Sequence, residues 1–205
     1  MGDMVEGQNS KNTIELYETD TEVQAEIAAE CASVIPCRKE AMLTVYGTPF
    51  HTAGSYSFEN HFTDSLGVSR PESTHRVVIP DMVRVNIRHY VGRSSIPYGQ
   101  GTPTYKEMVN ELIDAIRKED DSADITLRGH AHYDVAMKVS GREAIVVPCL
   151  KFPAGVFGRR VSETQYDMGI GILDIYGVKD WSYHSILLPL DIGGKRTWKK
   201  IGGKS

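Results

Sequence analysis

The stretch DITLRGHAHYD, residues 124–134, decides the fold, because it joins a short buried strand to a pair of histidines. The β-branched and apolar residues of 124–128 predict a strand, and Gly129 predicts where it ends. His130 and His132 follow two positions apart, so a loop can direct both imidazoles to one region. Imidazole nitrogen is a good ligand for zinc, manganese and similar divalent metals. A pair of hydrogen-bonding histidines in a turn is the alternative interpretation that the pattern leaves open.

Two further histidines follow predicted strands. The strand expected at 82–87 ends just before His89, and the strand expected at 42–46 runs into a loop that carries His51. In open α/β sheets, functional side chains gather at the C-terminal ends of strands. A single histidine at a strand end is more often structural, but three such segments together predict one shared site.

Helices and strands are expected to alternate in the first part of the chain, and strands cluster in its last part. Capping-box spacing of Thr19 and Glu22 predicts a first helix, with an apolar stripe running to Ile35 that buries Cys31. Helices are also expected at 58–66 and 103–119. The remaining periodic segments predict strands at 42–46, 75–79, 82–87, 124–128, 134–139, 143–148, 165–176 and 181–188.

This order predicts an α/β sandwich with mixed sheets rather than a doubly wound parallel sheet. The length of 205 residues suits a single domain over 1–205, with residues 1–20 and 193–205 largely loop or tail. A chain of this length can form one large hydrophobic core that needs no disulfide or metal ion to stabilise it.

Composition narrows the class of protein. Lys and Arg total 23 against 27 Asp and Glu, a net charge of −4, so no general nucleic-acid-binding surface is predicted. Three sparse cysteines are typical of reduced thiols in a cytoplasmic protein. The sequence has no apolar run of about 20 residues and no apolar core of a signal peptide. We therefore expect a cytoplasmic protein without a membrane partner.

The order of the histidine segments resembles the calcineurin-like metallophosphoesterases. In that family an Asp-x-His motif comes first, followed by Gly-Asp, Gly-Asn-His, a single His and Gly-His-x-His. The Gly-Asp at 2–3 resembles the second motif, 47–51 lies where the third belongs, His89 resembles the fourth, and 129–132 matches the fifth closely. The resemblance covers about residues 1–150 and implies a calcineurin-like α-β-β-α sandwich with mixed sheets.

The resemblance also implies roles for individual residues. Asp3 would bridge two divalent metal ions, His132 would ligate the first ion, and His89 and His130 would ligate the second. Manganese is the expected metal, with iron, zinc and nickel as alternatives. A metal pair of this kind activates water and stabilises the charge that develops on a phosphoryl group. The implied activity is hydrolysis of phosphomonoesters or phosphodiesters, and a nucleotide or nucleic-acid substrate stays open.

The chain departs from the family pattern in two places. Thr48 stands where the family has a metal-binding Asn, and His51 is displaced by two positions. His51 is therefore either a catalytic proton donor or metal ligand on a longer loop, or an ordinary loop histidine. No Asp-x-His precedes Asp3, so we expect an N-terminally truncated domain whose missing segment lies upstream or on another polypeptide. We expect this chain alone to expose an apolar sheet edge and to be a weak or inactive hydrolase.

Two other interpretations compete with the enzyme. The chain is either a catalytically inactive metallophosphoesterase-like module for binding or scaffolding, or an unrelated α/β protein whose histidines are structural. The enzyme requires Asp3, His89, His130 and His132 to converge, whereas structural histidines would point apart.

Overall fold

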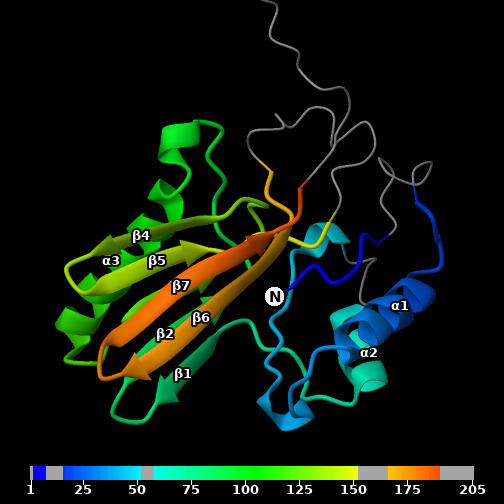
Figure 1. Ribbon diagram of the computed structural model, residues 1–205, viewed down its shortest axis with the longest axis horizontal. Helices are drawn as coiled ribbons and strands as arrows, with labels where there is room; N and C mark the ends of the chain where they lie inside the picture. Colours follow the sequence, from blue (N-terminus) through cyan, green and yellow to red (C-terminus); the bar gives the residue numbers. More distant parts are fainter. Residues whose placement is uncertain (1, 8–15, 52–57, 152–165, 190–205) are drawn as a thin grey trace, which may run out of the picture.

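The computed structural model describes residues 2–7, 16–51, 58–151 and 166–189. It has an α/β fold with a five-stranded mixed sheet, a two-stranded sheet and flanking helices (Figure 1). The predicted fold class, an α/β arrangement with mixed sheets, is confirmed.

The larger sheet has the strand order β1-β2-β3-β5-β4. Its three inner strands run parallel, and each outer strand is antiparallel to its neighbour. The strands are β1 (His75–Ile79), β2 (Val83–Arg88), β3 (Ile125–Arg128), β4 (Val135–Val139) and β5 (Arg142–Val146). Parallel inner strands end at the same edge of the sheet, which brings the segments after β2 and β3 together.

Both faces of this sheet are covered. Helix α3 (Thr102–Lys118) packs on β3 and β5, and the hairpin of β6 (Gly169–Gly177) and β7 (Asp180–Leu187) covers the opposite face (Figure 1). The core on the hairpin side centres on Trp181, which is 5% exposed. The buried residues packed with it are Val83, Val85, Ile125 and Ile145.

Helices α1 (Thr21–Ser33) and α2 (Phe58–Leu66) form a separate layer beside the sheet (Figure 1). They pack on each other and on Val5 of the N-terminal segment. The buried residues of this second core are Val5, Ala25, Ala29, Phe58, Phe62 and Leu66. This packing holds residues 2–7 in place near the sheet edge.

Two details of the first helix differ from the prediction. Asp20, not Thr19, caps α1, because the Asp20 carboxylate accepts the backbone N–H groups of Glu22 and Val23. The buried face carries alanines, which let α2 approach closely, and Cys31 is exposed. The predicted stripe was therefore wrong about which face is buried.

The strand predicted at 42–46 is also wrong. Only one residue there, Val45, forms an isolated parallel bridge, with Glu72. The backbone of Glu72 bonds to Thr44 and Tyr46 on either side of Val45, and no longer ladder forms among the described residues. The segment is nevertheless fixed, since Val45 is 1% exposed, and it leads directly into Gly47.

The remaining helices and strands match their predicted segments closely. Three short turns of 3₁₀ helix are also present in the described residues: η1 (Lys39–Ala41), η2 (Pro49–His51) and η3 (Pro97–Gly99). Within 2–7 and 16–20 the chain has neither helix nor strand, as expected. The expected tail at 193–205 and the start of the strand at 165 lie outside the described residues. In the described part of the chain, no helix has the length and apolar character needed to cross a membrane.

Candidate metal centre

The centre of the site lies at the C-terminal ends of β2 and β3. His89 follows β2 directly, and His130 and His132 follow β3 after Gly129. The backbone N–H of Gly129 donates to the carbonyl of His89 at 3.0 Å, which extends the strand pairing by one step. The rings of His89 and His130 meet edge to face, with centroids 5.4 Å apart.

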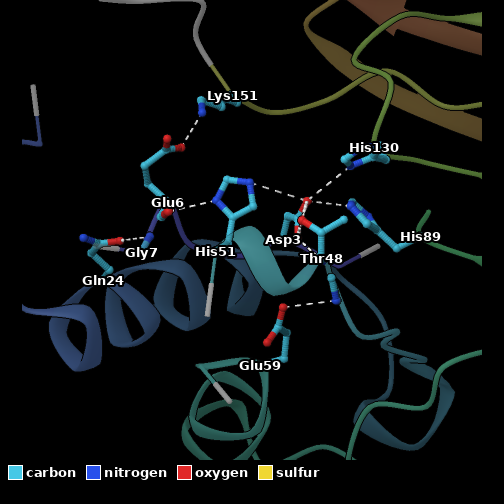
Figure 2. A network of polar contacts seen from close by, with 11 residues as sticks. Asp3, Glu6, Gly7, Gln24, Thr48, His51, Glu59, His89, His130 and Lys151 are labelled. Carbon is cyan, nitrogen blue, oxygen red and sulfur yellow. Dashed lines mark hydrogen bonds and ion pairs between the residues drawn. The ribbon is translucent and has the colours of Figure 1, made fainter. Parts of the chain in front are cut away.

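Three imidazoles surround one oxygen of Asp3 (Figure 2). The distances to Asp3 Oδ2 are 2.7 Å from His89 Nε2, 3.6 Å from His130 Nδ1 and 3.7 Å from His51 Nε2. Ligand atoms of Asp3, His89 and His130 all lie within 4.8 Å of one another. The predicted convergence of these three residues is therefore present.

Thr48 orients the carboxylate. Its backbone N–H donates to Asp3 Oδ1 at 2.5 Å, and its hydroxyl lies 3.2 Å from each carboxylate oxygen. One oxygen of Asp3 is thus held mainly by Thr48, while the other faces the histidines. Thr48, at the loop position where the sequence resemblance predicts an Asn, supports the carboxylate here instead.

Two glycines make this contact sterically feasible. A Cβ on Gly47 would overlap the carboxylate and backbone nitrogen of Asp3, and a Cβ on Gly2 would overlap the backbone of Gly47. The buried carboxylate of Glu59, on α2, accepts the N–H of Gly47 at 3.1 Å and fixes the loop from below (Figure 2).

The backbone at the site is strained. Asp3, His130 and His132 adopt the left-handed conformation, with φ of 57°, 65° and 61°. This conformation costs a non-glycine residue roughly 1–2 kcal/mol, and such strain collects at functional sites, where the surroundings hold it. Three strained residues at one centre indicate that the fold accepts a local cost in backbone energy to place these side chains together.

His51 reaches the same centre from η2. Its Nδ1 lies 2.8 Å from the carbonyl oxygen of Glu6, and because a carbonyl only accepts, Nδ1 carries the proton. Nε2 is thereby directed at Asp3 (Figure 2). The carboxylate of Glu6 pairs with Lys151, which ties this segment to the chain after β5. The displaced position of His51 in the sequence does not keep it away from the site.

His132 lies beside the three-residue cluster but is not part of it. Its ring packs edge to face on Tyr166, with centroids 5.3 Å apart, and its carbonyl accepts the N–H of Asp167. Burial, with smaller contributions from the charges of Lys151 and Arg93, lowers the pKa of His132 to about 4. The ring is therefore neutral at pH 7, the state in which imidazole binds metals.

The electrostatics favour an ionised Asp3. Burial by itself raises the pKa of this carboxyl, but the contacts with His130 and His89 and the nearby His51 outweigh it and hold the pKa well below its usual range. Asp3 is therefore a carboxylate at any pH at which the imidazoles are also available as ligands.

The donor set fits a divalent metal ion. His130 Nδ1 is buried, faces Asp3, and has no hydrogen-bond partner among the described residues. A buried polar nitrogen without a partner is costly unless something binds it. One carboxylate oxygen and two imidazole nitrogens within 4.8 Å offer the ligands that zinc, manganese or iron accept.

All the residues proposed from the sequence, Asp3, His51, His89, His130 and His132, are thus gathered in one region. Sequence reasoning missed the support from Glu59, because an acidic residue in a short helix gives no sign that it will be buried. It also missed the Glu6 carbonyl, since any residue could supply that acceptor.

We expect Gly47→Ala to displace Asp3, because the added methyl group has no room beside the carboxylate. The variant should unfold at lower denaturant concentration and should bind divalent metal more weakly than wild type. Gly177→Ala is the matched control, since a Cβ there meets nothing within 4 Å. Wild-type metal binding by the Gly47 variant would contradict this packing.

The lowered pKa of His132 predicts a pH dependence for the metal-free protein. The unfolded chain binds this proton near pH 6.5 and the native state only near pH 4, so native stability falls as the pH drops through this window. His132→Gln should lose less unfolding free energy than wild type between pH 7 and pH 5, measured by urea denaturation in EDTA. An identical loss in both proteins would show that His132 titrates normally.

No family model and no curated protein matches the chain. Among solved structures, it is similar to a novel archaeal phosphodiesterase, at 17% identity over 79% of this chain and 76% of that one, with a TM-score of 0.44. It is also similar to a single mutant of Vps29 from Entamoeba histolytica, at 13% identity over 72% of this chain and 69% of that one, with a TM-score of 0.37.

Proposed function

We propose that this chain is a metal-dependent phosphoesterase that hydrolyses phosphomonoesters or phosphodiesters. The observation that carries the proposal is the approach of three imidazole nitrogens to one oxygen of Asp3. Two of these imidazoles stand at the ends of neighbouring parallel strands, where an α/β sheet usually places its site.

Asp3, His89 and His130 would hold a divalent ion, and Asp3 with His132 would hold a second. Manganese is the first choice, with iron, zinc and nickel as alternatives. Metal ions at such a site polarise a phosphoryl oxygen and lower the pKa of water to near neutrality. The ionised Asp3 supplies the negative charge that such a site needs, and Thr48 keeps the carboxylate aimed at the histidines.

His51 is the proposed general acid. The Glu6 carbonyl holds one proton on Nδ1, so the proton that the imidazolium form of His51 can release is the one on Nε2, which faces the centre. A proton held there can pass to the oxygen of a leaving alcohol, a step that typically contributes 10²–10⁴-fold to a rate. Its side chain is 14% exposed, which shields the transfer from bulk water.

The open side of the site suggests the substrate. The ring of Tyr90, 54% exposed, lies 4.9 Å from the ring of His130, which is itself partly exposed. Exposed aromatic faces stack on nucleobases and similar rings. Lys151 and Arg93 add positive charge near His132. These features favour a phosphoester that carries an aromatic or nucleotide group.

A binding or scaffold module without catalysis is the second candidate. One observation favours it: in the described part of the chain, only Asp3, His89 and His130 form a mutual ligand cluster, enough for one ion. Such a module would bind one metal ion and a phosphate group but would not turn over a phosphoester.

The test is hydrolysis of bis(p-nitrophenyl) phosphate by the purified chain with Mn²⁺, monitored through the nitrophenolate released. The reaction is followed to long times, because the chain alone is expected to turn over weakly. His130→Ala should reduce turnover by at least about 100-fold and weaken Mn²⁺ binding, because loss of a ligand costs at least as much as loss of a residue that supports one. His184→Ala is the matched control, since that imidazole is exposed on β7 beside Asp174. It should leave turnover unchanged.

The outcomes separate the two candidates. Full activity in the His130→Ala variant would overturn the enzyme proposal. One bound ion per chain, with no turnover in manganese, iron, zinc or nickel, would favour the binding module instead.

A further inference from the structure

A network of charged side chains lies beneath the two histidines, on the face of the sheet that α3 covers. Arg88 and Arg128 are the last paired residues of β2 and β3. Their positive charges are therefore neighbours at the end of the parallel ladder, and each repels the other. The arrangement needs an anion to hold the two strand ends together.

Glu107 of α3 supplies that anion. One oxygen, Glu107 Oε2, accepts from Arg88 Nη2 at 2.8 Å and from Arg128 Nε at 2.7 Å. The Arg88 side chain is half exposed, but that of Arg128 is only 4% exposed and has little access to water as a substitute partner. Removal of one partner from a buried ion pair is strongly disruptive, because the remaining charge stays buried.

Arg128 also bonds directly to the backbone of both strands. Its Nη1 donates to the carbonyl of Leu127 at 2.8 Å on β3 and to the carbonyl and side chain of Asn86 at 3.1 Å on β2. The Asn86 amide in turn donates to Glu111 at 3.0 Å, one turn further along α3. One guanidinium and two carboxylates thus connect β2, β3 and α3. They line a cavity of about 380 Å³ on this face, away from the metal centre.

The network ends where the metal centre begins. Arg88 immediately precedes His89, and Arg128 precedes His130 by two residues. The next backbone bond along the strand pair joins Gly129 to the carbonyl of His89. Any widening between Arg88 and Arg128 would therefore separate the two imidazoles.

We infer that Arg88, Glu107 and Arg128 are positioning residues that set the spacing of His89 and His130 and thereby the affinity of the site for divalent metal. The inference rests on the proposed function, because it treats these histidines as ligands. It assigns the network no contact with substrate or metal. Its effect passes only through the strand ends.

The chain offers a matched control for charge and strand. Arg84 lies on the same face of β2 and pairs with Asp121 at 2.8 Å, but this pair is exposed and sits at the other end of the strand. A general loss of ion pairing at the sheet would affect both pairs. A positioning role would affect only the pair beside the histidines.

The experiment compares Glu107→Gln with Asp121→Asn by calorimetric titration with Mn²⁺. Glu107→Gln should weaken Mn²⁺ binding about 10- to 100-fold, the usual effect of residues that orient metal ligands. Asp121→Asn should bind Mn²⁺ as wild type does. In the metal-free proteins, the ¹⁵N resonances of His89 and His130 should move in Glu107→Gln and stay in place in Asp121→Asn.

Unchanged Mn²⁺ affinity and unchanged histidine resonances in a folded Glu107→Gln protein would overturn the inference, as would equal losses in both variants. If Glu107→Gln does not fold, Glu111→Gln takes its place, because it removes only the outer contact to Asn86. A smaller loss in the same direction then supports the inference, and no loss overturns it. If the wild-type protein binds no metal, the proposed function fails. The histidine resonances alone then decide whether the network sets the spacing of His89 and His130.

Discussion

The Asp3 carboxylate is the interaction on which the site depends. Thr48 and the close approach of Gly47 hold one side of it, and three imidazoles surround the other. A carboxylate that is only 10% exposed would be unstable without such partners, because burial disfavours the charged form. The histidines offset this cost, and the same contacts create a cluster of ligands with the charge that a metal ion needs.

The two halves of the molecule meet at this carboxylate. Parallel pairing of β2 and β3 brings His89 and His130 to one edge of the sheet, while α1 and α2 hold the segment that carries Asp3. The left-handed backbone at Asp3, His130 and His132 shows that local conformational preference is overridden there. Proteins retain such strain where surrounding contacts are strong enough to impose it. Here the Arg88–Glu107–Arg128 network and the Thr48 contacts are the supports on either side.

Much of this arrangement could be predicted from local patterns. The pattern of 124–128, followed by Gly129 and two histidines, correctly predicted β3 and the loop that carries these histidines, since alternation and turn residues are local signals. Gly2-Asp3 and His89 were predicted to be site residues because the order of these segments along the chain resembles the motif order of the calcineurin-like metallophosphoesterases. The strand at 42–46 was predicted from its apolar residues, but a strand also needs a neighbour, and composition does not show whether one is present. The buried face of α1 was misjudged for a similar reason. Ala25 and Ala29 are buried, and Ile27 and Val34 are exposed, because α2 packs closely against the alanines. Helical spacing alone does not show this tertiary effect.

Three other supports of the site could not be predicted from the sequence. Glu107, Glu59 and the Glu6 carbonyl act through contacts between residues far apart in sequence, and a helical glutamate is usually solvated. The sequence alone does not decide the role of His51, because the direction of its side chain depends on how the loop folds. Its ring orientation follows from one backbone carbonyl, which carries no sequence signature.

X-ray absorption at the zinc edge of the zinc-loaded protein tests the central claim most directly, because it counts the nitrogen neighbours of the bound ion. The account predicts at least two imidazole nitrogens at about 2.0–2.1 Å, reduced by one in His130→Ala. A zinc ion surrounded only by oxygen, with a spectrum that His130→Ala does not change, would contradict it.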